Sequence, residues 1–324
     1  MSELNYWSLG EKISLRDAFG LALTALAGKR DDFVLFDADV AGGTGSKPFV
    51  KAFPEKTIQF GIAEQNMMAA AAGFADTGII PVVTTFAAFG VMRAHEQFRT
   101  AIAYAQRNVK LCCSHLGLDV GPDGATAQML EDLGTMRAIP NVTVVVPADA
   151  NQLMKALPAV LDHQGPVYMR IGRSPAPVIT GSTTPFAIGK AYRMREGNDL
   201  TLAATGVMVA RALEAADFLQ KEGISARVVN VSTIKPLDRE EILAAARETR
   251  AILTAEDHNV FGGMGSAIAE LLSQELPVPM KIMGVQDQFG KSGEPEELAE
   301  RFGLSTRHLV QAAKELMHRR ENLK

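Results

Sequence analysis

Short runs of apolar and β-branched residues alternate with longer amphipathic segments over the first half of the chain. The short runs are typical of buried strands, whereas the longer segments, such as residues 14–28 and 149–162, are typical of helices. Strands are expected at residues 33–39, 80–86, 108–114, 142–148 and 166–172. An alternation of strand and helix predicts a parallel sheet with helices on both faces.

A second alternation of the same kind begins near Asp199. It predicts strands at residues 199–206, 226–232, 250–258 and 278–285, and helices at about 207–222, 238–248, 263–275 and 305–319. The segment between the two alternations is rich in Pro, Gly, Ser and Thr, which is typical of a linker with a short strand or two. The sequence therefore predicts an α/β protein with domains at 1–173 and 199–324, a linker at 174–198, and a mostly parallel sheet flanked by helices in each domain.

Composition narrows the class of protein. The chain has 324 residues, is 47% hydrophobic and carries a net charge of -4, which suits two domains with real cores. It has no apolar run long enough to span a membrane and no signal-peptide pattern at its start, so we expect a cytoplasmic protein. The absence of a block of Lys and Arg argues against nucleic acid or membrane as the main partner.

The only two cysteines, Cys112 and Cys113, are adjacent in an expected strand. Neighbouring residues of a strand point to opposite faces, so a disulfide between them is disfavoured and buried free thiols are expected. Nothing in this pattern indicates a zinc site.

The stretch "QFGIAEQNMMAAAAGFA", residues 59–75, places a single carboxylate, Glu64, before a helix with almost no polar face. An acid in the first turn of a helix complements the helix dipole, and this alone accounts for many such residues. A helix without a polar face, however, is expected to be buried on most sides. A carboxylate entering it needs a hydrogen-bond donor, either from the chain or from a ligand.

Other candidates follow the predicted strands of the first domain. Phe86, Phe89 and Met92 are spaced by three, which suits either core packing or the wall of a flat heterocycle. His115 directly follows a strand, where a ligand or catalytic role is one possibility. Arg173, like Arg170 before it, suits either a phosphate site or an ion pair.

Two glycine-rich segments give weaker signals. The turn "DADVAGGTGSKP" fits neither a dinucleotide fingerprint nor a P-loop, so a flexible loop is expected there. Its Asp37 and Asp39 still stand at a strand end, where α/β sheets bind ligands. In the second domain, "EDHNVFGGMGSAIAE" suits a turn into a helix and makes a weak case for an anion site.

Five segments in a fixed order resemble the transketolase family of thiamine diphosphate enzymes. They are "QFGIAEQNM", "TTFAAF…RAHEQFR", "SHLGLDVGPDGAT…LEDL…MRAIPN", "GPVYMRIGR" and "ILTAEDH…GGMGSAIAE". The resemblance runs from about residue 12 to 318 and corresponds to the pyrimidine-binding and C-terminal domains only. It is strongest to the small subunit of split, two-chain transketolases, and it implies transfer of a two-carbon ketol unit from a ketose phosphate to an aldose.

The resemblance implies a role for each candidate near the cofactor. Glu64 matches the family glutamate that hydrogen-bonds the aminopyrimidine of thiamine diphosphate and so activates the cofactor. Phe86 and Phe89 match residues that pack on the pyrimidine, and Met92 lies near a third such position.

The resemblance also implies a substrate site. His115 and Arg173 match residues at the substrate phosphate, and Asp39 matches an aspartate near the bound sugar. Two positions depart from the family pattern, because Ala127 stands in place of a histidine and Gly43 in place of a phosphate-binding serine. We expect these losses either to shift substrate preference or to weaken the enzyme.

One family motif is absent from the sequence. The Gly-Asp-Gly motif, which holds the metal and the diphosphate in these enzymes, does not occur. The resemblance therefore implies a partner chain that carries this half of the site together with Mg²⁺ (or Ca²⁺ or Mn²⁺), in an assembly with two of each subunit. Two alternatives remain open: the beta subunit of a 2-oxo-acid dehydrogenase, and a scaffold or regulator without activity.

Overall fold

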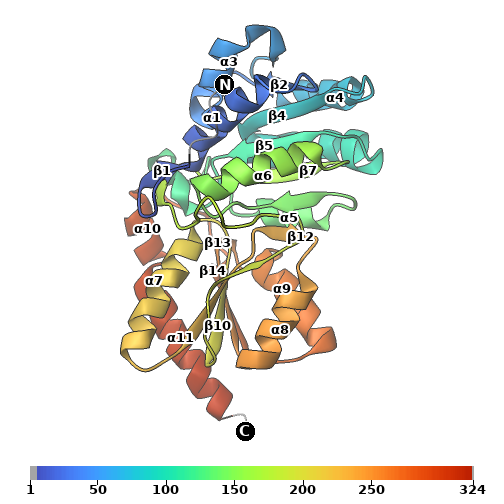
Figure 1. Ribbon diagram of the computed structural model, residues 1–324. Coiled ribbons are helices and arrows are strands. Elements are labelled where there is room, and N and C mark those ends of the chain that lie inside the picture. Colours follow the sequence, from blue (N-terminus) through green and yellow to red (C-terminus); the bar gives the residue numbers. More distant parts are fainter. Residues whose placement is uncertain (1–5, 323–324) are drawn as a thin grey trace.

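The computed structural model describes residues 6–322 and contains two large sheets, one above the other in Figure 1. The first has seven strands in the order β12-β6-β7-β5-β4-β2-β3. All its pairings are parallel except that of β12 with β6. Their bounds are β2 (Phe33–Asp37), β3 (Thr57–Gln59), β4 (Ile80–Phe86), β5 (Lys110–Ser114), β6 (Thr143–Val145), β7 (Val167–Ile171) and β12 (Thr233–Lys235).

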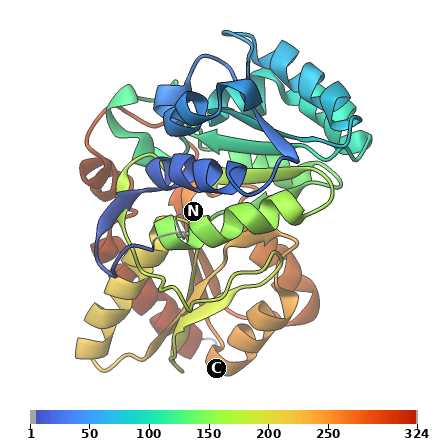
Figure 2. The ribbon, with the colours of Figure 1, turned by 45° about the horizontal axis from the view of Figure 1, so that its top comes forward.

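Helices cover both faces of this sheet. On one face α1 (Leu15–Ala27) and α6 (Ala150–Asp162) lie side by side, as Figure 2 shows, and α3 (Lys47–Ala52) packs beside α1. On the other face lie α4 (Glu64–Ala75), the π-helical segments η2 (Ala88–Arg93) and η3 (Gln97–Tyr104), and α5 (Asp132–Ala138). The two faces contribute to different core clusters, with Cys112 in one and Cys113 in the other. The prediction of two buried free thiols is confirmed.

The second sheet has five strands in the order β14-β13-β10-β11-β9, and only β9 is antiparallel to its neighbour. Its strands are β9 (Tyr192–Arg195), β10 (Leu200–Ala204), β11 (Ala226–Asn230), β13 (Ile252–Asn259) and β14 (Met280–Val285). One face is covered by α7 (Met208–Lys221) and α11 (Thr306–Glu321), and the other by α8 (Arg239–Thr249) and α9 (Met264–Glu275). The predicted α/β fold with two mostly parallel sheets is confirmed, while the exact domain limits remain a prediction.

The two sheets share part of their core. One apolar cluster runs from Met67 of α4 and Leu111 of β5 to Ile242 of α8 and Ile268 of α9. Further links are β12, which joins the first sheet, and α10 (Pro295–Arg301), which packs against the 3₁₀ segment η4 (Leu118–Asp123). Apolar residues of α8 and α9, which flank the second sheet, therefore help to bury the core of the first domain.

Some local expectations differ from the structure. The glycine-rich turn after β2 is not a flexible loop, because it forms α2 (Ala41–Thr44), followed by α3 and η1 (Pro54–Lys56). The linker, by contrast, contains short strands as expected: β8 (Pro175–Pro177), which pairs with β1 (Lys12–Ser14), and β9. Within residues 6–322 there is no helix of the length and apolarity that crossing a membrane requires.

Candidate functional site

The candidate residues of the first domain gather where its strands end. Phe86 is the last residue of β4, and His115 directly follows β5. Arg173 and Asp39 lie two residues after the ends of β7 and β2. Because these strands are parallel, their carboxyl ends lie at one edge of the sheet, which is where open α/β sheets bind ligands.

Glu64 is the first residue of α4 and is only 2% exposed. Its Oε2 accepts a hydrogen bond from Nη1 of Arg93 at 2.9 Å, and no other described residue donates to the carboxylate. Arg93 lies 29 residues further along the chain, and sequence analysis missed it. The buried acid therefore has one oxygen paired within the chain and the other without a protein donor among residues 6–322.

Aromatic rings lie beside this pair. The Phe86 and Phe89 rings are stacked, with centroids 5.6 Å apart and planes at 22°. The Arg93 guanidinium lies 4.6 Å from the Phe89 centroid. Phe89, Met92 and Arg93 all belong to the π-helical turn η2, a rare conformation that is frequent at functional sites. Met92 is 51% exposed to solvent, so it is not a core residue of this chain.

The His115 ring also stacks on Phe86, with ring centroids 3.6 Å apart and planes at 18°. Its backbone is in the left-handed region at φ 59°. Its Nδ1 is 2.9 Å from the Ser114 hydroxyl and its Nε2 is 3.2 Å from Oδ2 of Asp123. Burial lowers the pKa of His115 from 6.5 to about 4, against the opposing effect of Asp123. The ring is therefore neutral at neutral pH.

Two arginines lie next to His115. Arg173 Nη2 donates to Oδ1 of Asp123 at 3.2 Å, and Arg16 Nη1 donates to the Gly43 carbonyl at 3.4 Å. The Nε of each arginine is buried and has no hydrogen-bond partner among residues 6–322. Sequence analysis missed Arg16, although a cation in the first turn of a helix opposes the dipole and so is itself a signal. The positive charge of these two guanidinium groups suits an anion.

Asp39 and Gly43 lie on the turn after β2. Asp39 has φ 62° and an exposed side chain, and its backbone N–H donates to Oδ2 of Asp37 and Oε1 of Gln59. Burial raises the pKa of Asp37, whose Oδ1 finds no hydrogen-bond partner in the part of the chain that the structure describes. A Cβ on Gly43 would come within 2.6 Å of the Phe86 ring, so the glycine permits the observed position of that ring.

Two other candidates do not join this site. Arg170 is buried and donates through two nitrogens to Asp132, so it is neither a surface ion pair nor free for phosphate. In the second domain Glu256 accepts hydrogen bonds from the N–H groups of Met264 and Gly265. The amino end of α9 is thus occupied by the chain's own carboxylate.

Comparison with known proteins assigns the family. Residues 11–178 match the model described as "Transketolase, pyrimidine binding domain", and residues 189–309 match "Transketolase, C-terminal domain". The chain belongs to the transketolase family and corresponds to the C-terminal subunit of a split transketolase, as the resemblance implied. The pyrimidine-binding domain implies thiamine diphosphate as the cofactor.

Relatives of similar length are named as transketolase subunits. The "6-deoxy-6-sulfo-D-fructose transketolase subunit SqwH" of Clostridium sp. (strain MSTE9) is 44% identical over 94% of this chain and 95% of its own. An apulose-4-phosphate transketolase subunit of Phocaeicola vulgatus is 37% identical over 94% of this chain and 98% of its own. A solved structure, "Split gene transketolase, inactive beta4 tetramer", matches with a TM-score of 0.89 and 44% identity over 95% of this chain and 99% of its own.

The residues present fit one half of a thiamine diphosphate site. A buried carboxylate with one free oxygen, next to stacked aromatic rings, suits a planar ring that carries N–H groups. Among residues 6–322, no three His, Cys, Asp or Glu side chains are grouped so that they could hold a metal ion.

Proposed function

We propose that this chain, together with a partner chain that carries the Gly-Asp-Gly half-site, transfers a two-carbon ketol unit from a ketose phosphate to an aldose acceptor. The observation that carries the proposal is the cluster at the carboxyl edge of the first sheet. It joins buried Glu64 to the stacked rings of Phe86 and Phe89, and these rings to His115 and the two arginines next to it.

The cofactor half of the cluster has three kinds of proposed contact. Glu64 accepts a hydrogen bond from the aminopyrimidine through its free oxygen, and burial strengthens this contact. Phe86 and Phe89 fix the plane of the ring, and Met92 borders it. Thiamine diphosphate itself supplies the nucleophilic carbon to which the two-carbon unit is transferred.

The substrate half binds the anionic end of the sugar. Arg173 and Arg16 offer the charge, and the guanidinium geometry matches a phosphate better than a lysine would. His115, which is neutral, contributes a hydrogen bond without adding charge. Asp39, whose side chain is exposed, remains the proposed neighbour of the sugar.

The missing half of the site requires a second chain. We propose that this chain holds the diphosphate through Mg²⁺, or Ca²⁺ or Mn²⁺, and that two copies of each subunit assemble. Support comes from the relatives that are named as transketolase subunits and from the relative whose beta chains alone form an inactive tetramer. We also keep the prediction of a cytoplasmic location.

Of the two alternative functions, the dehydrogenase interpretation is not supported, because the family models and the relatives are transketolases. A scaffold has no use for a buried acid that has one oxygen without a protein donor among residues 6–322, since such burial costs stability. The substrate remains to be identified, and Ala127 and Gly43 are where we expect preference to be set. Replacing Ala127 by His should change the relative rates with ordinary pentose phosphates, and unchanged rates would remove this position from the specificity argument.

The test is reconstitution with the product of a gene that carries the Gly-Asp-Gly motif. Thiamine diphosphate with Mg²⁺ is titrated calorimetrically into this chain and into the mixture, and ketol transfer is assayed with ketose phosphates and a ketose sulfonate. We expect binding and turnover in the mixture only, and a loss of about 100-fold or more for Glu64→Gln, because the group that activates the cofactor is removed. Glu55→Gln, an exposed acid of the same domain, is the control. Tight binding and turnover by this chain alone would contradict the proposal.

A further inference from the structure

The carboxylate of Asp119, in η4, binds the backbone of Arg173. Its Oδ2 accepts hydrogen bonds from the N–H groups of Arg173 and Ser174, both at 2.9 Å. The Ser174 hydroxyl donates to the Asp119 carbonyl at 2.7 Å. Hydrogen bonds to an ionised acceptor are roughly twice as strong as those between neutral groups. Asp119 therefore fixes the chain after β7 at the residue that carries the Arg173 guanidinium.

The guanidinium of Arg173 has few other contacts that fix it. Its Nη2 donates to Oδ1 of Asp123 at 3.2 Å, which is long for a hydrogen bond between charged groups. Among residues 6–322 its Nε has no partner, and Asp123 is its only ion-pair partner. On the amino-terminal side, the Gly172 carbonyl accepts from the N–H of Arg16 at 3.2 Å. The position of the guanidinium thus depends mainly on where its backbone is held.

Asp119 is held in turn by the second domain. The two carboxylate oxygens of Asp257, on β13, accept hydrogen bonds from the N–H groups of Leu118 at 2.8 Å and Asp119 at 3.0 Å. A Cβ on Gly117 would collide with this carboxylate, so the glycine permits the close approach. A continuous set of hydrogen bonds therefore runs from the second domain through η4 to Arg173.

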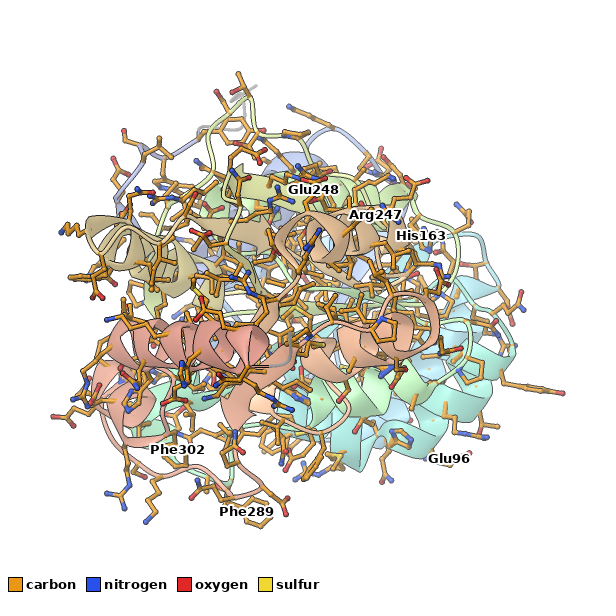
Figure 3. All side chains as sticks on the ribbon, turned by 90° about the horizontal axis from the view of Figure 1, so that it is seen from below. Glu96, His163, Arg247, Glu248, Phe289 and Phe302 are labelled. Carbon is orange, nitrogen blue, oxygen red and sulfur yellow. The ribbon has the colours of Figure 1, made fainter. Side chains whose placement is uncertain are left out.

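The second domain also covers η4. The helix α10 packs against this segment, and Gln128, shortly after it, donates to the Lys291 carbonyl of the loop before α10 at 2.8 Å. Figure 3 shows Phe289, from the same loop, and Phe302, directly after α10, at the same edge of the molecule. These contacts keep the backbone of Asp119 in place.

We propose that Asp119 is a positioning residue for the substrate: it holds Arg173 where the guanidinium meets the anionic end of the ketose phosphate. This inference rests on the proposed function, which assigns that end of the sugar to Arg173. In this role Asp119 does not contact the substrate and acts only through backbone N–H groups. All of its side-chain hydrogen bonds within residues 6–322 are made by Oδ2.

The test compares a ketose phosphate with the same ketose lacking the phosphate, in the reconstituted complex. Asp119→Ala should raise KM for the ketose phosphate about tenfold at nearly unchanged kcat, the effect of one weakened hydrogen bond to a charged group. For the ketose without phosphate, kcat/KM should stay as in wild type, because Arg173 has no anion to bind. Asp119→Asn should restore the wild-type KM, since its carbonyl oxygen can still accept from both N–H groups.

Asp199→Ala is the matched control. Asp199 is also half-buried and accepts from a backbone N–H, that of Ser225 at 2.7 Å, but it directly precedes β10 of the second domain. Its loss should lower stability and change neither KM nor kcat. Asp119→Ser, which keeps a short polar group, takes the place of Asp119→Ala should the alanine protein not fold.

An Arg173→Ala background separates the outcomes. If Asp119 acts through Arg173, adding Asp119→Ala to Arg173→Ala raises KM for the ketose phosphate no further. Additive effects, equal losses with both ketoses, no rescue by Asp119→Asn, or an unchanged KM in Asp119→Ala each overturn the positioning role and leave the proposed function in place. A wild-type complex without ketol transfer refutes the proposed function, and this inference with it.

Discussion

His115 is the residue whose surroundings most directly predict a measurable property. It is 2% exposed, and burial lowers its pKa from 6.5 to about 4. The unfolded chain therefore takes up a proton at this site below pH 6.5, while the folded chain does not until about pH 4. Because the unfolded state binds more protons in this window, the stability that neutral His115 contributes is lost as the pH falls from 6.5 toward 4.

Replacing His115 by Gln removes this proton uptake. Between pH 7.5 and pH 4.5, wild type should lose about 2 kcal/mol more stability than the variant, as measured by urea unfolding at both values. Asp119, whose burial raises its pKa to about 6, has the opposite effect, but it is present in both proteins and cancels in the comparison. An equal pH dependence in the two proteins would mean that His115 is not buried as the structure shows.

At the same scale, sequence patterns found some site residues and missed others for a clear reason. Phe86, His115 and Arg173 follow strands, and strand ends can be predicted from hydrophobic runs. Arg16 and Arg93 meet their partners 27 and 29 residues away, on helical elements that only tertiary packing brings to the site. No local sequence pattern predicts a contact between residues that far apart in the chain. The roles of all these residues remain predictions.

At the scale of elements, α9 shows how a helix end can lose its capacity for ligands. Glu256, on the adjacent strand β13, is fully buried and accepts from the N–H groups of Met264 and Gly265 at 2.7 and 2.8 Å. This carboxylate satisfies donors that would otherwise attract an anion. Removing it would leave buried N–H groups without a partner.

Glu256→Ala should therefore lower the free energy of unfolding by about 2–3 kcal/mol, the cost of buried donors left unpaired and a charged hydrogen bond lost. Glu256→Gln, which keeps one acceptor oxygen, should cost less. The matched control is Glu297→Ala, an exposed acid in the first turn of α10. It should change stability by less than about 1 kcal/mol in thermal or urea unfolding. If Glu256→Ala leaves the free energy of unfolding close to that of wild type, water accepts the hydrogen bonds in place of the carboxylate.

Elements with a regular period were predictable and irregular ones were not. The helices expected near 207–222 and 305–319 are α7 (Met208–Lys221) and α11 (Thr306–Glu321). The π-helical turns of η2 and η3 break the period of 3.6 residues, so the spacing of Phe86, Phe89 and Met92 does not report how these side chains point. The irregular turn η2 places Arg93 within hydrogen-bond distance of Glu64.

At the scale of the whole molecule, the exposed side of α4 indicates where a partner chain is expected to bind. Its sequence has almost no polar face, which predicts burial on most sides, yet Gln65, Asn66, Ala69 and Gly73 are exposed in this chain. Next to Glu64, Ile62 is 79% exposed, and Met92 nearby is 51% exposed. Apolar exposure beside an incomplete site is typical of a surface that another chain covers. We therefore expect the partner subunit to bury Ile62.

Ile62→Lys tests this expectation. Burying the isoleucine should contribute about 1.5–3 kcal/mol, so its loss, with a charge placed in the interface, should weaken association with the partner at least about tenfold. Leu21→Lys is the control, because Leu21 is 49% exposed but belongs to α1 on the opposite face of the sheet. Association is measured by sedimentation or native mass spectrometry, with circular dichroism to show that each variant is folded. If Ile62→Lys binds the partner as tightly as wild type, the partner does not bury Ile62 and the cofactor site is completed from a different side.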